Sequence, residues 1–117
     1  MPSFKQGDVV KVPFPYTDRS TRQFRPALVA SSGGIEAAHG LLWVVMITSA
    51  DNRGWPGDVP VGNLAMAGLP VASVIRTAKI ATIEASDAEK LGKVSRTLIG
   101  QVVRHLQREL GLAAPER

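Results

Sequence analysis

The feature of this sequence that most constrains its fold is the uninterrupted apolar run LLWVVMI, Leu41–Ile47. Gly40 precedes the run and Thr48 follows it. A continuous apolar stretch of this length, between residues that end regular structure, is typical of a strand buried on both of its faces. The run therefore predicts a strand inside the core.

Other short apolar segments between residues 8 and 84 are also predicted to be strands. In DVVKVPF (Asp8–Phe14), the alternate residues Val10, Val12 and Phe14 fall on one face. Further strands are predicted at Pro26–Ser31, at Asp58–Val61, and in ASVIR and AKIATIE, which are joined or bent near Arg76. Short strands with frequent turns are typical of a small barrel.

The remainder of the chain is predicted to be helical. Ser86 and Glu89 have the spacing of a capping box, with Gly92 placed to end a short helix. Ser95 is placed to cap a longer helix that runs to about Leu110. Its apolar stripe, expected to pack on the barrel, consists of Leu98, Ile99, Val102, Val103, Leu106 and Leu110. We therefore expect a mainly β fold with a C-terminal helix, in one domain over residues 1–117.

Composition excludes several classes of protein. The chain has no cysteine, which excludes disulfides, thiolate metal sites and a cysteine nucleophile. Its N-terminus lacks the pattern of a signal peptide, and no apolar run has membrane-spanning length, so a cytoplasmic location without membrane contact is expected. The net charge of +4 fits an anionic partner such as nucleic acid, although the charge alone is weak evidence.

No pattern of a metal site, a cofactor site or a hydrolytic triad is present in the sequence. His39 and His105 are far apart and lack carboxylates at ligand spacing, so neither a metal nor a cofactor is expected. Polar residues do stand at the ends of predicted strands, among them Arg25, Thr48 and Arg76. If they converged they would form a phosphate site without a metal. From spacing alone, the ordinary polarity of strand ends is the better explanation.

Four blocks of the sequence resemble one family. GDVVKVPFPYTD followed by RPALV resembles the opening of the MazF/PemK toxins of bacterial type II toxin–antitoxin systems. WVVMITS and SVIRTAKIATIE resemble the next two blocks, and LGKVS with an amphipathic helix resembles the family's C-terminus. The resemblance covers nearly the whole chain, and it depends on four blocks in the right order rather than on one strong motif.

The resemblance implies a compact SH3-like barrel that forms a homodimer, binds a cognate antitoxin and cleaves single-stranded RNA without a metal. The family's catalytic arginine and threonine correspond to Arg25 and Thr48. Its third-block arginine, which serves RNA binding or acid–base chemistry, corresponds to Arg76. A fixed guanidinium at Arg25 would stabilise the negative charge that a phosphorane gains in the transition state.

One departure from the family pattern leaves the general base unassigned. Many members have a glutamate five residues before the catalytic arginine, where this chain has Ser20; Asp18 is a possible substitute. The residues expected to contact RNA, besides Arg76, are Thr17, Asp18, Ser49, Arg53 and Trp55. Trp55 either stacks on an unpaired base or packs against the barrel or the second subunit.

Two alternatives to a ribonuclease stay open at this point. The related CcdB toxins share the fold but bind DNA gyrase, and the presence of Arg25 and Thr48 argues against that activity here. A barrel that keeps the fold and antitoxin binding but has lost catalysis is compatible with the missing glutamate. For the dimer interface, the connector NLAMAGLP (Asn63–Pro70) and Trp55 are the candidates.

Overall fold

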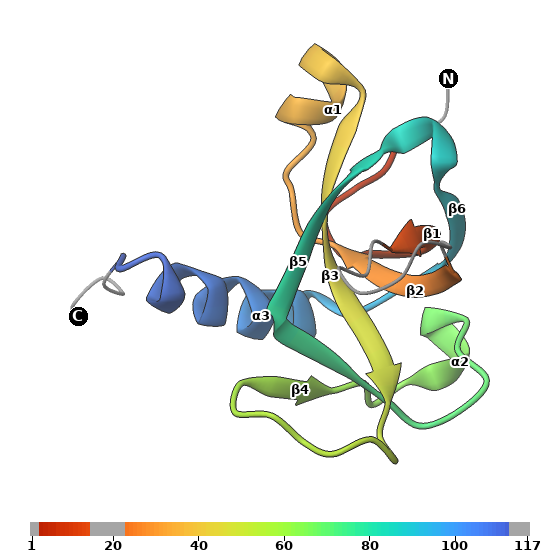
Figure 1. Cartoon of the computed structure of the whole chain (residues 1–117), viewed down its shortest axis with the longest axis vertical. Coiled ribbons are helices and arrows are strands. Elements are labelled where there is room, and N and C mark those ends of the chain that lie inside the picture. Colours follow the sequence, from red (N-terminus) through yellow and green to blue (C-terminus); the bar gives the residue numbers. More distant parts are fainter. Residues whose placement is uncertain (1–2, 15–22, 113–117) are drawn as a thin grey trace.

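The computed structural model describes residues 3–14 and 23–112 of the chain. A strongly curved sheet forms the body of the molecule, and the C-terminal helix extends from one side of it (Figure 1). In chain order the elements are β1 (Asp8–Phe14), β2 (Gln23–Val29), α1 (Gly34–His39), β3 (Leu41–Ser49), β4 (Asp58–Pro60), α2 (Leu64–Ala67), β5 (Ser73–Glu84), a 3₁₀ turn (Ala85–Asp87), β6 (Glu89–Lys93) and α3 (Arg96–Glu109).

The strands form one antiparallel sheet in the order β4-β5-β3-β2-β1-β6. The register between β3 and β5 shifts after Val45, which lies opposite Ile80, so that Met46 lies opposite Arg76. Extra residues in β5 at this point bend the strand, as predicted for this segment. The expected mainly β, barrel-like fold with a C-terminal helix is confirmed. Within the described residues the sheet curls without closing, because β4 and β6 at its ends do not pair with each other.

β3 is buried on both faces, which explains why its sequence is continuously apolar. Val44 and Met46 belong to a core cluster on one face, whereas Val45 and Ile47 belong to a cluster on the other face. Successive side chains of a strand point to opposite faces, so only a strand covered on both sides needs an unbroken apolar run. Trp43 is the exception within this run, because its residue surface is 52% exposed.

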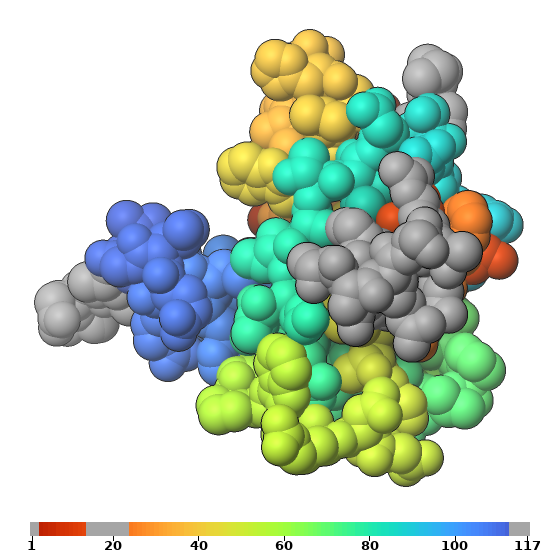
Figure 2. Space-filling model, viewed as in Figure 1, coloured from red at the N-terminus to blue at the C-terminus, as the bar shows by residue number. Residues whose placement is uncertain are grey.

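α3 packs on the second cluster through Leu98, Ile99, Val102 and Leu106. Ser95 caps the helix as predicted, since its side-chain oxygen accepts a hydrogen bond from the N–H of Leu98 at 3.2 Å. Val102 is fully buried in the second cluster. Leu110, expected to pack on the barrel, is instead 74% exposed. The C-terminal end of α3, beyond Leu106, extends away from the sheet (Figure 2).

The predicted short helix between Ser86 and Gly92 is wrong. That segment is a 3₁₀ turn followed by strand β6, which pairs with the edge of β1. The capping pattern is only a local preference for the start of a helix, whereas pairing with β1 also covers the free edge of that strand. Tertiary pairing has therefore overridden the local signal.

α2 is packed tightly against β6, and a glycine makes this contact possible. A Cβ added at Gly92 would fall on the backbone atoms of Met66 and Ala67. We expect Gly92→Ala to lower the free energy of unfolding by about 2–4 kcal/mol, because backbone atoms cannot move aside as a flexible side chain can.

Urea unfolding of purified variants measures this effect. Gly100→Ala is the matched control, since the nearest atom to its added Cβ is the Arg104 guanidinium at 3.6 Å. Gly100 lies inside α3, so this change should stabilise the protein by about 0.5–1 kcal/mol. Equal effects of the two substitutions would contradict the tight contact between α2 and β6.

Candidate active site

Arg25 and Thr48 lie on neighbouring strands and on the same face of the sheet. Ala27 of β2 pairs with Met46 of β3, and this register, extended by two residues, brings Arg25 opposite Thr48. Residues two apart in a strand share a face, so both side chains belong to the face of the first core cluster, at its polar edge. Pairing of β2 with β3 ends at Ala27, next to Pro26, which has no N–H to donate.

The hydroxyl of Thr48 is oriented by an asparagine. Thr48 is buried, and its Oγ1 accepts a hydrogen bond from Nδ2 of Asn52 at 2.6 Å. A hydroxyl that accepts one hydrogen bond keeps its own proton for a second partner. Thr48 is therefore arranged as a donor, which is the role that a developing negative charge on a phosphate oxygen requires.

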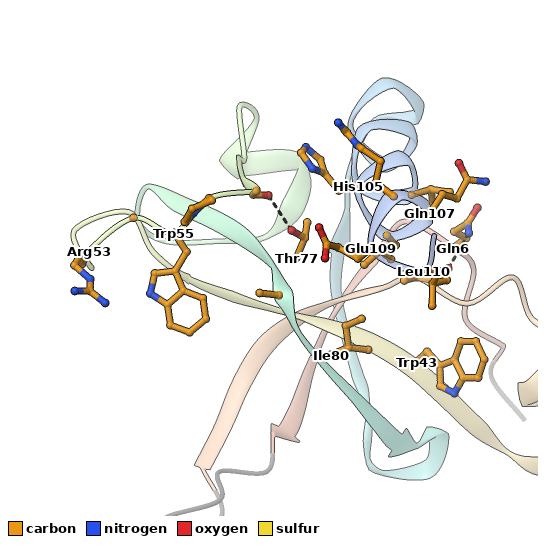
Figure 3. Close-up of a pocket in the computed structure, with 18 residues that line it drawn as sticks. Gln6, Trp43, Arg53, Trp55, Thr77, Ile80, His105, Gln107, Glu109 and Leu110 are labelled. Atoms are coloured by element: carbon orange, nitrogen blue, oxygen red, sulfur yellow. Dashed lines mark hydrogen bonds between the residues drawn. The ribbon is translucent and has the colours of Figure 1, made fainter. Parts of the chain in front are cut away.

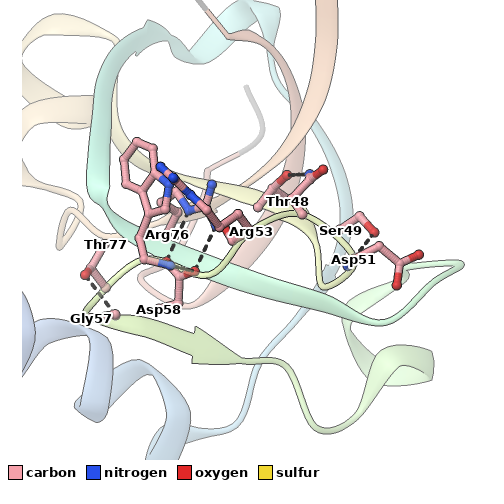
Figure 4. A network of polar contacts seen from close by, with 10 residues as sticks. Thr48, Ser49, Asp51, Arg53, Gly57, Asp58, Arg76 and Thr77 are labelled. Carbon is pink, nitrogen blue, oxygen red and sulfur yellow. Dashed lines mark hydrogen bonds and ion pairs between the residues drawn. The ribbon is translucent and has the colours of Figure 1, made fainter.

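Arg76 lies on the same face as Thr48, at the centre of a polar network (Figure 4). Its Nε donates to Oδ1 of Asp58 at 3.2 Å, and its Nη2 donates to Oδ2 of the same carboxylate at 2.9 Å. Nη2 also donates to the carbonyl oxygen of Arg53 at 2.7 Å. The guanidinium lies 4.4 Å from the centre of the Trp55 ring. Arg76 is 7% exposed, so these contacts form in a largely dry environment.

Arg76 lowers the pKa of Asp58 below its ordinary value of 3.8, chiefly through the side-chain hydrogen bond. Burial acts in the opposite direction, while the N–H of Trp55 and the charge of Arg76 lower the pKa further. A carboxyl with a lowered folded-state pKa stabilises the protein above its unfolded pKa, and this contribution is lost as the pH falls through the lowered value. The Asp58 carboxylate is therefore ionised at neutral pH.

The remaining residues predicted from the sequence do not all join this face. Ser49 follows Thr48 in β3 and so belongs to the opposite face, where its Oγ accepts a hydrogen bond from the N–H of Asp51 at 3.1 Å. Arg53 is exposed on the loop between β3 and β4. Thr17 and Asp18, predicted to contact RNA, lie outside the described residues, as does Ser20.

A groove of about 1250 Å³ runs between α3, β5 and the loop before β4 (Figure 3). The groove has two ends of different character. Arg53 and Trp55 lie at one end, which we call the loop end. Trp43, Ile80 and Leu110 lie at the other, which we call the apolar end.

Neither a metal cluster nor a membrane span is found in the part of the chain that the structure describes. Within residues 3–14 and 23–112, no three His, Asp or Glu side chains gather so as to hold a metal ion. No helix among the same residues is long and apolar enough to cross a bilayer.

Sequence reasoning missed Asn52 and Asp58, which contact the side chains of Thr48 and Arg76. Asn52 is four residues after Thr48 and could have been noticed as a local polar neighbour. Asp58 begins a strand that the sequence predicts, but its pairing with Arg76 depends on the β4–β5 register. No spacing in the sequence indicates that register.

The curled antiparallel sheet with its C-terminal helix defines a small barrel-like protein of the SH3-like kind. The chain belongs to the PemK-like, MazF-like toxins of type II toxin–antitoxin systems, whose sequence profile matches residues 5–110. The family expected from the sequence is thereby confirmed. A search of curated proteins found no match.

Solved structures share the fold at low sequence identity. MazF of Deinococcus radiodurans (Form-I) is 24% identical with a TM-score of 0.77, covering 96% of this chain and 100% of that one. An endoribonuclease in complex with its cognate antitoxin, from a mycobacterial species, is 20% identical with a TM-score of 0.73, covering 98% and 100%. The Mycobacterium tuberculosis toxin MazF-mt6 is 20% identical with a TM-score of 0.68, covering 90% and 98%.

Proposed function

We propose that this chain is an endoribonuclease toxin that cleaves single-stranded RNA, chiefly messenger RNA, and that the whole chain forms one toxin domain. The observation that carries the proposal is the alignment of Arg25 with Thr48 on one face of neighbouring strands, in a member of this toxin family. A guanidinium and an oriented hydroxyl, side by side, are suited to hold the oxygens of one phosphate.

In the proposed reaction Arg25 binds the scissile phosphate and stabilises the charge that it gains in the transition state. Thr48 donates its proton to a phosphate oxygen or to the 2′-oxygen, with Asn52 fixing the direction of that proton. Neither group has to move when the charge develops, so both favour the transition state over the ground state.

Incubation of purified protein with an unstructured RNA tests the proposal. We expect endonucleolytic fragments in vitro and growth arrest when the chain is induced alone in a bacterium. If the protein arrests growth and inhibits gyrase while RNA stays intact, it is a gyrase-binding toxin. If it leaves both RNA and growth unaffected but binds an antitoxin, it is an inactive barrel.

The proposed partners are RNA and a cognate antitoxin, in the cytoplasm. The antitoxin complexes formed by MazF of Deinococcus radiodurans and by the mycobacterial endoribonuclease support an antitoxin here. The net charge of +4 suits both an anionic RNA backbone and an acidic segment of an antitoxin.

We further propose a homodimer in which a second copy covers the apolar end of the groove. Trp43, Ile80 and Leu110 are 52%, 55% and 74% exposed there, beside the end of α3 that extends away from the sheet. Exposed apolar residues that gather in one place mark an interaction site. The connector Asn63–Pro70, the candidate from the sequence, makes contacts within its own chain: its helix α2 packs on β6, and Ala67 is fully buried.

Charge placed at the apolar end should therefore separate the subunits. We expect wild-type protein to sediment as a dimer at micromolar concentration and Ile80→Glu to sediment as a monomer, because an unpaired buried carboxylate strongly disfavours association. Val71→Glu is the control, since Val71 is 54% exposed and does not line the groove. A monomeric wild type, or a dimeric Ile80→Glu, would contradict this interface.

A further inference from the structure

The guanidinium of Arg76 connects several points of the loop between β3 and β4. It donates three hydrogen bonds, two to Asp58 and one to the carbonyl oxygen of Arg53, and its face lies against Trp55. A guanidinium has five N–H donors in one plane, so most of this one's bonding capacity is used on the loop and on the start of β4. Its charge is balanced by Asp58, and it is 7% exposed.

Trp55 is held both by its backbone and by its ring. Its N–H donates to Oδ2 of Asp58 at 3.0 Å, and its ring lies 4.4 Å from the guanidinium carbon of Arg76. The amino group of Lys79 lies 5.6 Å from the centre of the same ring. A cation near an aromatic face attracts it electrostatically, and more strongly where water is excluded. Asp58 therefore acts on Trp55 directly through one hydrogen bond and indirectly through Arg76.

The indole is held in place but remains accessible. Trp55 is half-buried, and it lines the loop end of the groove together with Arg53 (Figure 3). An aromatic ring with accessible surface beside a cation is the arrangement on which an unpaired base stacks while its backbone phosphate is neutralised. Trp55 is also close to the candidate active site, because Arg76 and Thr48 are diagonal neighbours on one face of the sheet.

We propose that Asp58, acting through Arg76, is a positioning residue that holds the Trp55 indole as a stacking platform for one unpaired base beside the cleaved phosphate. The proposal rests on the proposed ribonuclease function and adds to it the residue that selects a base. It also changes the role expected of Arg76 from the sequence. Arg76 is committed to holding Trp55, rather than to binding a phosphate.

The first experiment tests the positioning in the free protein. The chain has two tryptophans, so labelling with 5-fluorotryptophan gives two fluorine NMR signals, and Trp55→Phe assigns them. In Asp58→Asn we expect the Trp55 signal to move toward that of free 5-fluorotryptophan and to sharpen, while the Trp43 signal stays in place. Arg76→Lys should act in the same way, because an ammonium has neither the planar fork nor the stacking face.

The matched control is Asp51→Asn, which makes the same chemical change in the same loop. Asp51 is exposed, and its backbone N–H donates to Oγ of Ser49, with no side-chain contact to Trp55 or Arg76 among the described residues. In Asp51→Asn the Trp55 signal should remain at the wild-type position. A Trp55 signal that is unchanged in Asp58→Asn, with the Trp43 signal confirming a folded protein, would overturn the positioning role whatever the protein does to RNA.

The second experiment tests the stacking on RNA. The probe is a random-sequence single-stranded oligonucleotide with 2′-O-methyl riboses, which supplies bases and phosphates but no free 2′-hydroxyl. Its addition should shift the Trp55 signal and leave the Trp43 signal in place. With cleavable RNA, Trp55→Leu should raise KM roughly 5- to 150-fold, the factor given by about 1–3 kcal/mol per stacked base. Its kcat should change far less, because stacking is made equally before and in the transition state.

Mapping the ends of the RNA fragments completes the test. We expect Trp55→Leu to lose the base preference at one position of the cleaved sequence and to keep the preferences at the others, while Trp55→Phe keeps most of the preference at that position. If the wild type cleaves RNA and Trp55→Leu has the same KM and cleaves the same sequence, the stacking is overturned while the ribonuclease function stands. If no RNA is cleaved and none moves the Trp55 signal, both the ribonuclease function and the stacking are overturned.

Discussion

Replacing Arg25 by alanine is expected to lower the cleavage rate by about 10²–10³-fold, the usual effect of removing one fixed donor to a developing oxyanion. The same change should abolish growth arrest by the induced toxin. Arg25→Lys should lose most of the activity as well, because an ammonium is a point charge that cannot reproduce the bidentate fork of a guanidinium. Single-turnover cleavage of an unstructured RNA measures the chemical step directly.

Arg104→Ala is the matched control for the loss of one positive charge. Arg104 is exposed on α3 and does not lie on the face that carries Arg25. This variant should cleave RNA at nearly the wild-type rate, since a distant exposed charge is largely screened by salt. If Arg25→Ala folds and cleaves as fast as Arg104→Ala, the active site has been assigned to the wrong residues.

Two substitutions at Thr48 separate the effect of its hydroxyl from the effect of its side-chain shape. Thr48→Val removes the oxygen and keeps the branched shape, whereas Thr48→Ser keeps the oxygen. We expect the valine variant to lose about as much activity as Arg25→Ala, and the serine variant to retain much of it. The valine variant also leaves Nδ2 of Asn52 without its acceptor, so its folding should be verified by circular dichroism.

The sequence predicted those parts of the fold in which local pattern and tertiary environment agree. β1 has the predicted bounds, β3 was recognised from its apolar run, and α3 begins after the predicted Ser95 cap. The sequence failed at β6, because the free edge of β1 competes with a local capping pattern there. The sequence also did not predict that the end of α3 leaves the sheet. The apolar stripe of the helix does not indicate which of its residues pack on the sheet of the same chain and which stay exposed.

The candidate site was predicted only in part, because strand register decides which of its side chains meet. Arg25 and Thr48 came from the family resemblance, and the register of β2 with β3, extended by two residues, explains how residues so far apart in sequence come to one face of neighbouring strands. Asp58 contacts Arg76 across β4 and β5, which depends on a register that no local pattern encodes. The contacts that orient the site are therefore less visible in the sequence than the groups proposed to do its chemistry.

The nucleophile of the proposed reaction is expected to come from the RNA itself. In the proposed site Arg25 would supply charge and Thr48 a hydrogen bond, and the 2′-hydroxyl of an RNA substrate lies next to its phosphate. An attacking group held so close replaces a bimolecular step by an intramolecular one, which is worth several orders of magnitude in rate. We therefore expect the 2′-oxygen to lose its proton to a base and bond to phosphorus, while the bond to the 5′-oxygen breaks and that oxygen takes up a proton.

This reaction leaves a 2′,3′-cyclic phosphate on one fragment and a 5′-hydroxyl on the other, which mass spectrometry distinguishes from the products of water attack. A substrate with a 2′-deoxy nucleotide immediately before the cut should not be cleaved, whereas a deoxy nucleotide one position further on should leave cleavage intact. Cleavage should also persist in excess EDTA, because Arg25 rather than a divalent cation is proposed to stabilise the phosphorane. A requirement for added Mg²⁺, or cleavage at the deoxy position, would mean that water is the nucleophile and that Arg25 and Thr48 serve a different reaction.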